Sequence, residues 1–276
     1  MDEPLYRRTV TLPNPYSGMT PEITWSGVLM MLLLVLVPMA LDRLLRLNLL
    51  RDILVSVGRM LLQLALMALF LELLIKWDAP WLNVLWFGVM VLAASHSALT
   101  RNQLPLHRFW KPVFLAMAIS VLLAVVYFNV LIINIKSPFS ARFFVVAAGM
   151  VLGNAMKGII IVLDKFITGL ARDRNVYYYR LSLGATRYEA LYPWIRQSIR
   201  ASLQPIIATM ATMGLVSIPG MMTGQVLAGT NPFLAVRYQA AIVLVIFVAM
   251  ISAVTLTVLF SIRLVTTDTG TLRPLT

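Results

Sequence analysis

Several polar or soft side chains lie inside long apolar stretches of this chain, where the chemistry open to them is weak, reversible contact with a solute. Carboxylate oxygens, amide oxygens and thioether sulfurs can each coordinate a passing cation. Ionisable groups at membrane depth cost about 2.5–3.5 kcal/mol on insertion scales, so they usually face a cavity or a partner. We predict a translocation path that includes Glu72, Asn154, Pro219, Gly220, Met221, Met222 and Gln225.

Simpler roles for these residues stay open. Glu72 lies near the end of its apolar run and could reach water, and Asn154 could hydrogen-bond between helices. The two methionines could fill space beside a kink. The Pro219–Gly220 pair is more specific, because Pro removes a backbone donor and Gly permits unusual dihedral angles. It predicts a helix interrupted at membrane depth, which is tolerated where freed backbone groups line a cavity or find a buried partner.

A second constellation lies in segment 164–202, the only long connection between apolar runs. The segment has a helical pattern up to Leu183, and Gly184 follows at the position where a left-handed residue commonly ends a helix. Thr186 and Glu189 have the spacing of a capping box, which predicts that another helix begins there. Gly184 is therefore expected to form a corner between two short helices.

Farther along, apolar and basic residues separate onto different stripes of the second expected helix. Ile195, Ile199 and Leu203 recur every four residues, and Arg196 and Arg200 share another stripe. This pattern predicts an amphipathic segment that lies at the membrane interface before the chain enters the bilayer.

Residue types needed for enzymatic chemistry are scarce. The chain has no cysteine, and His96 and His107 are too few for a histidine cage, so the metal ligands are unknown. No lysine follows a glycine and precedes Ser or Thr, which excludes the P-loop route to ATP hydrolysis. Neither HExxH nor GxSxG occurs. We expect no catalytic residue and no cofactor in this chain.

The elements that position these residues are membrane-spanning helices. Hydrophobic residues make up 60% of the 276-residue chain and charged residues 12%, against about 25% in soluble domains. Apolar runs of about 20 residues recur, each long enough to cross the hydrocarbon layer. We predict an all-α bundle of about seven transmembrane helices, at about 23–41, 53–75, 81–99, 112–135, 142–163, 203–228 and 236–262.

Basic residues set the expected orientation of this bundle. Fifteen of the 23 Lys and Arg residues fall in alternate loops and the C-terminal tail, and six fall on the other side. The richer side should be cytoplasmic, with the N-terminus outside and the C-terminus in the cytoplasm. The same topology accounts for the net charge of +12 better than nucleic-acid binding does. The expected regions are a polar segment 1–22, a transmembrane domain 23–263 and a tail 264–276.

Several stretches together resemble a family of bacterial membrane proteins that includes the Fet-type iron-export permease subunit of ABC transporters. Membrane subunits of plant aluminium-sensitivity half-transporters belong to the same family. The stretches are DILVSVGRMLLQL at 52–64, GMVLGNAM at 149–156, LSLGAT at 181–186, SIRASLQP at 198–205, GLVSIPGMMTGQVLAG at 214–229 and AVRYQ at 235–239. They are spread along the chain from residue 52 to residue 239.

The resemblance implies a multi-pass permease of the bacterial inner membrane that exports a metal such as iron. A separate ABC ATPase would bind ATP and Mg²⁺, and two copies of each subunit would assemble in the bilayer. In ABC permeases a helix pair with a glycine corner docks on the ATPase. Here Tyr178-Tyr179-Arg180 stand in place of the usual Glu-Ala-Ala, so the docking role depends on the corner itself. The coupling residues implied are Leu183, Gly184, Ala185, Thr186 and Glu189.

Other functions remain open at this point. Within the family, transport of a nucleotide-sugar-like solute has also been proposed. An ion-gradient-driven secondary transporter, with Glu72 as its titrating group, and a non-transporting membrane scaffold are further possibilities. An ABC ATPase encoded next to this chain would favour the first function.

Overall fold

The computed structural model describes residues 24–267 and 270–273, so the polar segment 1–22 expected from the sequence lies outside the described residues. The chain divides into two compact units, which are considered separately. The first contains residues up to Leu73 together with Gly220–Val236, and the second contains Leu74–Pro219 and Arg237–Thr276.

Helices dominate the described residues, which confirms the expected all-α class of membrane protein. The two isolated β-bridges found there, Met213 with Ser217 and Thr266 with Leu272, belong to no strand. The helices are α1 (Trp25–Leu33), α2 (Leu36–Leu45), α3 (Leu50–Trp77), α4 (Pro80–Arg101), α5 (Leu106–Tyr127), the π-helical η1 (Phe128–Ile132), α6 (Ala141–Arg172), α7 (Arg174–Ser182), α8 (Arg187–Thr212), α9 (Gly220–Leu227) and α10 (Pro232–Val265).

Six segments of the described chain are long and apolar enough to cross a membrane. They are Ser26–Leu45, Leu50–Trp77, Pro80–Arg101, Leu106–Ile132, Ala141–Arg172 and Pro232–Val265. Six of the seven predicted spans therefore have a counterpart. The first is divided into α1 and α2 at residues 34–35, and the fourth ends in the π-helical turn.

The remaining predicted span, 203–228, is not one continuous helix. Its first part is the end of α8, residues 213–219 are non-helical, and α9 begins at Gly220. The interruption expected around Pro219 and Gly220 is present, but the helix ends earlier, at Thr212. The left-handed residue is Gly214 (φ +87°), whose N–H donates to the Ser217 carbonyl at 2.9 Å. The unusual dihedral angle expected of Gly220 thus belongs to Gly214.

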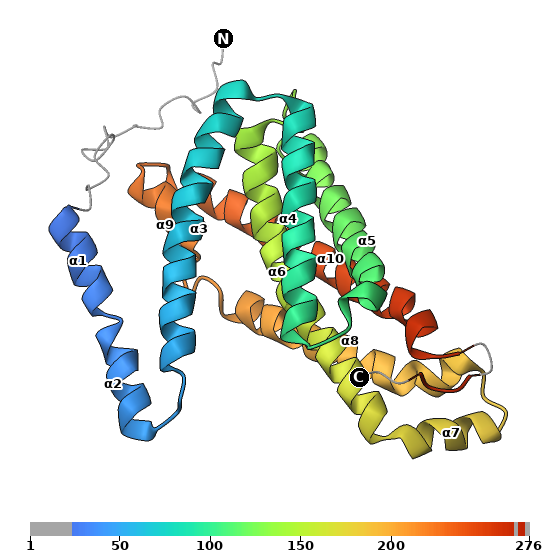
Figure 1. Ribbon diagram of the computed structural model, residues 1–276. Helices are drawn as coiled ribbons and strands as arrows, with labels where there is room; N and C mark the ends of the chain where they lie inside the picture. The colour runs from blue at the N-terminus through green and yellow to red at the C-terminus, as the bar shows by residue number, and fades with distance from the viewer. Residues whose placement is uncertain (1–23, 268–269, 274–276) are drawn as a thin grey trace, which may run out of the picture. The chain divides into compact units, whose positions relative to one another are not determined.

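The core of the second unit is formed by α4, α5 and α6, which stand side by side (Figure 1). Phe87 of α4 and Phe144 of α6 meet edge to face at 5.7 Å between ring centroids. A Cβ on Gly158 of α6 would lie 2.7 Å from the terminal methyl carbon of Met250 in α10. Gly158 therefore permits the close approach of α6 and α10, whereas Gly153 on the same helix borders open space.

Asp78, just after α3, anchors the start of α6. Its carboxylate accepts hydrogen bonds from the Ala141 backbone N–H at 2.7 Å and from the Ser140 hydroxyl at 3.0 Å. Two buried amides hold the preceding loop, since Asn83 donates to the Phe139 carbonyl and Asn129 donates to the Pro138 carbonyl. The first turn of this long helix is thereby fixed, and its opposite end carries the candidate site.

Candidate functional site

A sharp corner between α7 and α8 forms the centre of the candidate site. Helix α7 ends at Ser182, and Gly184 adopts a left-handed conformation with φ of +88°. The Gly184 N–H donates to the Leu181 carbonyl, and the Ala185 N–H donates to the Arg180 carbonyl. These bonds satisfy the last carbonyls of α7 and turn the chain toward α8. The glycine corner predicted from the sequence is present.

Thr186 and Glu189 form the capping box that their spacing predicts. The Thr186 hydroxyl accepts a hydrogen bond from the Glu189 N–H at 3.3 Å, and Glu189 accepts one from the Thr186 N–H at 2.8 Å. The Thr186 hydroxyl also donates to the Glu189 carboxylate at 2.7 Å. These two donors on Thr186, the hydroxyl first, hold the pKa of Glu189 below its ordinary value.

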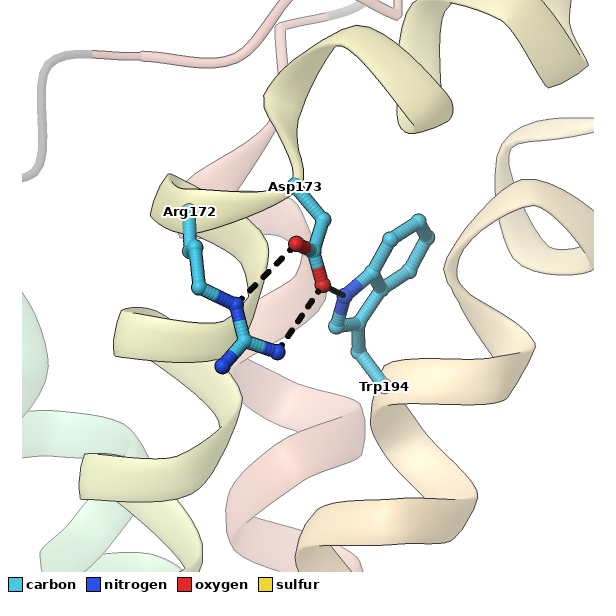
Figure 2. A network of polar contacts seen from close by, with 3 residues as sticks. All are labelled: Arg172, Asp173 and Trp194. Carbon is cyan, nitrogen blue, oxygen red and sulfur yellow. Dashed lines mark hydrogen bonds and ion pairs between the residues drawn. The ribbon is translucent and has the colours of Figure 1, made fainter.

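Asp173 and Trp194 join the end of α6 to α8. Asp173 pairs with the neighbouring Arg172 guanidinium at 3.1 Å, and the Trp194 indole N–H donates to the same carboxylate at 3.4 Å (Figure 2). The Arg172 hydrogen bond is the main cause that lowers the pKa of Asp173, and the Trp194 bond acts in the same direction. Gly169 makes room for the indole, because a Cβ there would lie 3.2 Å from the ring.

The C-terminal tail packs against α7. Residues Thr266 and Leu272 form an antiparallel bridge, and Gly270 is left-handed with φ of +83°. Tyr177 of α7 is buried and donates its hydroxyl hydrogen to the Gly270 carbonyl at 2.7 Å. The adjacent Tyr178 hydroxyl accepts the Leu272 N–H at 3.1 Å. The tail therefore fixes one side of α7, a contact that the sequence did not predict.

The other side of α7 presents an exposed apolar stripe. Val176, Tyr179 and Leu183 are 48%, 64% and 69% exposed, and their spacing of three and four residues places them on one face. Leu183 was predicted as a coupling residue, but Val176 and Tyr179 were not. The i, i+3, i+7 spacing of these three residues was the signal that could have identified them.

The predicted translocation residues fall in both units. Glu72 on α3 is exposed, and Met221, Met222 and Gln225 are half-buried on α9. The Gln225 Oε1 atom is buried without a hydrogen-bond partner among the described residues. Asn154, in the second unit, donates its amide hydrogen to the Met150 carbonyl of its own helix at 2.9 Å. That bond is within α6, and the role of Asn154 stays a prediction.

A metal cluster of hard or imidazole ligands does not occur in the part of the chain that the structure describes. Within that part no three His, Cys, Asp or Glu side chains gather closely enough to hold an ion. The Met, Gln, Asn and Glu side chains expected from the sequence to contact a cation stay predictions.

The long apolar helices and the short helical corner define the class of this molecule, a multi-pass helical membrane protein. The family model described as "Uncharacterised protein family (UPF0014)" matches residues 25–266. The chain belongs to this family, and the resemblance predicted from its sequence is confirmed. No solved structure matches the chain.

The match with each of three curated relatives extends over most of the relative's length. The chain is 32% identical over 225 residues to "UPF0014 membrane protein slr1647" of Synechocystis, covering 82% of this chain and 87% of the relative. It is 32% identical over 218 residues to "Probable iron export permease protein FetB" of Escherichia coli K12, covering 79% and 83%. It is 26% identical over 210 residues to "Protein ALUMINUM SENSITIVE 3" of Arabidopsis thaliana, covering 75% of each.

Proposed function

We propose that this chain is the permease subunit of an ABC transporter that exports a metal ion such as iron from the cytoplasm. The observation that carries the proposal is the exposed α7–α8 corner, centred on left-handed Gly184, in a chain related to an iron export permease. The chain has no P-loop motif, so a separate ATPase subunit supplies the hydrolysis, with ATP and Mg²⁺ bound there.

The corner is suited to docking because it is both apolar and held in place. Val176, Tyr179 and Leu183 offer exposed apolar surface. Burial of this surface against a partner would stabilise the complex by about 25 cal/mol for each Å² removed from water. Trp194 and Asp173 connect the corner to α6, so a displacement of α7 is transmitted to a membrane-spanning helix. In this assignment Leu183, Gly184 and Ala185 contact the ATPase, and Thr186 and Glu189 hold the start of α8.

The translocation path is proposed to pass the start of α9. The non-helical residues 213–219 leave backbone groups without helical hydrogen bonds. In a membrane such groups need water, a cavity or a partner. Met221 and Met222 would then offer soft sulfur, and Gln225 would offer its unpaired amide oxygen. Weak ligands of this kind suit a transporter, which must release the ion that it binds.

The proposed orientation rests on the basic residues of the chain, and the proposed assembly rests on its resemblance to ABC permeases. The α7–α8 corner and the C-terminus lie in the cytoplasm, with the N-terminus outside the bacterial inner membrane. Two permease copies and two ATPase subunits make the complete transporter. A reporter active only in the cytoplasm, fused to Thr276, should give a signal, and the same reporter fused to Asn14 should not.

Reconstitution tests the proposed function directly. The chain is co-expressed with a candidate ABC ATPase from the same genome, purified through a tag on the chain, and placed in proteoliposomes with the ATPase facing outward. Uptake of Fe²⁺ that requires ATP, and that stops with an ATPase unable to hydrolyse ATP, is expected. Transport by the chain alone under a proton gradient would contradict the proposal and favour a secondary transporter.

A further inference from the structure

A groove on the second unit runs between α8 and α10 and has no role in the proposed transport. It has a volume of about 670 Å³. Its lining residues are Tyr188, Tyr192, Ile195, Arg196, Ile199, Arg200, Leu203, Gln204, Ile207, Thr255 and Leu259. Because α10 is one of the six membrane-spanning candidates, lipid can reach this groove.

Two kinds of side chain line the groove. Ile195, Ile199, Leu203 and Ile207, each four residues from the next, give it an apolar floor from α8, and Leu259 of α10 closes it on the other side. Such a floor is shaped for a hydrocarbon chain and gives a small hydrated anion nothing to bind.

The second set is basic and aromatic. Arg196 and Arg200 are exposed and lie one helical turn apart on the same side of α8. Within the described residues, neither has an ion pair or a hydrogen bond. Their guanidinium groups are therefore available for a phosphate, which arginine can bind through two parallel hydrogen bonds.

Two tyrosines continue the basic stripe toward the start of α8. Tyr188 and Tyr192 are about half exposed, and their rings lie 6.5 Å apart. Tyrosine gathers at the level of lipid headgroups, where its ring is apolar and its hydroxyl group is wet. The groove thus has a polar region at the arginines and tyrosines, suited to a lipid headgroup, and an adjacent apolar floor.

We propose that this groove binds one anionic phospholipid, with its phosphate between Arg196 and Arg200 and an acyl chain along the isoleucine floor. Basic pockets between membrane helices recognise anionic headgroups in this way. A zwitterionic lipid carries a compensating positive charge and gains less from the two arginines. The inference needs only the membrane location of the chain, so it stands or falls independently of the proposed iron transport.

Lipid titration of the purified chain tests the proposal. The chain in neutral detergent is titrated with phosphatidylglycerol or phosphatidylcholine, and bound lipid is counted by native mass spectrometry. Phosphatidylglycerol should bind at least tenfold more tightly, and raising the salt to about 1 M should weaken that preference, since charge interactions are screened. Equal binding of the two lipids would overturn the proposal without any variant.

Variants locate the site. R196Q/R200Q should weaken phosphatidylglycerol binding by about thirtyfold, since each basic residue near an anionic surface is worth about fivefold. The matched control R43Q/R51Q removes the same charge from exposed arginines of α2 and α3 and should change binding less than twofold. An equal loss in both variants would show general attraction to basic surface and contradict the groove.

A charge-preserving variant and a competitor complete the test. R196K/R200K keeps the charge without the paired donors, so it should bind phosphatidylglycerol between the wild type and R196Q/R200Q, and it serves if the glutamine variant does not fold. A charge-based site would be contradicted if R196K/R200K bound phosphatidylglycerol only as weakly as the wild type binds phosphatidylcholine. Inorganic phosphate at 100-fold excess should leave the lipid bound, and displacement would identify an anion site and not a lipid site.

Discussion

The hydroxyl group of Tyr177 donates a 2.7 Å hydrogen bond to the carbonyl oxygen of Gly270, a residue 93 positions away in the chain. Burial raises the pKa of Tyr177, so its hydroxyl group remains a donor at neutral pH. This bond and the one from Leu272 to Tyr178 join the C-terminal tail to α7. The helix proposed to meet the ATPase is therefore held from behind by the last described residues of the chain.

Loss of this bond should release the tail from α7. In Y177F the Gly270 carbonyl stays buried without a donor, at a cost of about 1–3 kcal/mol. We expect a single cysteine introduced as L272C to react about tenfold faster with a water-soluble thiol reagent in the Y177F background. The chain has no natural cysteine, so the signal is specific. Y179F, which removes an exposed hydroxyl group from the same helix, is the control and should leave the rate unchanged.

A branched side chain at position 184 should distort the α7–α8 corner. Its φ of +88° costs a non-glycine residue about 1–2 kcal/mol, and more for a β-branched one. G184V should insert into the membrane and accumulate normally, but the amount of ATPase that co-purifies with it should be at least fivefold lower. G153A, at a helical glycine that borders open space, is the matched control. Normal ATPase recovery with G184V would show that the corner is not the docking element.

The exposed stripe of α7 should determine the affinity for the ATPase. Burial of a leucine side chain is worth about 1.5–3 kcal/mol, so L183S should raise the dissociation constant of the purified ATPase about tenfold or more. N175S, a polar exchange at an exposed position of the same helix, should have no effect. The measurement is surface-based binding of the ATPase to the chain in nanodiscs. Equal affinities for L183S and the wild type would place the contact elsewhere.

The capping box should make the start of α8 sensitive to acid. The pKa of Glu189 is lower in the folded protein than its ordinary value of 4.5, so the ionised carboxylate stabilises the helix start above that pH. This stabilisation is lost as the pH falls through the lower folded value. Hydrogen exchange of amides 187–191, corrected for the intrinsic rate, should accelerate between pH 5 and pH 3 in the wild type. E189Q, which does not titrate, should lack this additional acceleration.

The assignment of α9 to the translocation path predicts a pattern of solvent access. Single cysteines at Met221, Met222 and Gln225 should react with a water-soluble thiol reagent in membranes, and Fe²⁺ should protect them. Cysteines at Val226 and Leu227, the exposed apolar end of α9, are the controls for lipid-facing positions. If the cysteines at 221, 222 and 225 react no faster than these controls and Fe²⁺ does not protect them, the methionines are packing residues.

Local features were predictable from the sequence because their causes are local. The capping box needs only Thr186 and Glu189 at a fixed spacing, and the left-handed Gly184 needs only the end of a helix before it. The amphipathic pattern of α8 was also correct, since Ile195 and Leu203 are buried and Arg196 is exposed.

Features that depend on distant partners were not predictable. Nothing near Tyr177 indicates that its hydroxyl group meets Gly270, because that contact requires α7 and the tail to be placed by α6 and α10. The interruption before α9 was expected at Pro219, yet α8 ends at Thr212. The turn from Gly214 to Ser217 decides that boundary, and its hydrogen bond is set by a left-handed glycine whose conformation composition does not reveal.

Helix α6 is continuous over 32 residues, which at 1.5 Å per residue makes a rod about 48 Å long. The hydrocarbon layer is only about 30 Å thick, so about 18 Å of the rod extends past it. Asp173 and Gly169 attach the α7–α8 corner to that projecting end, and Asp78 fixes the opposite end. If the rod pivots at its start, a tilt of about 10° moves the end that carries the corner by about 8 Å. A displacement of the corner by a few ångströms would therefore tilt the whole of α6 about its fixed first turn.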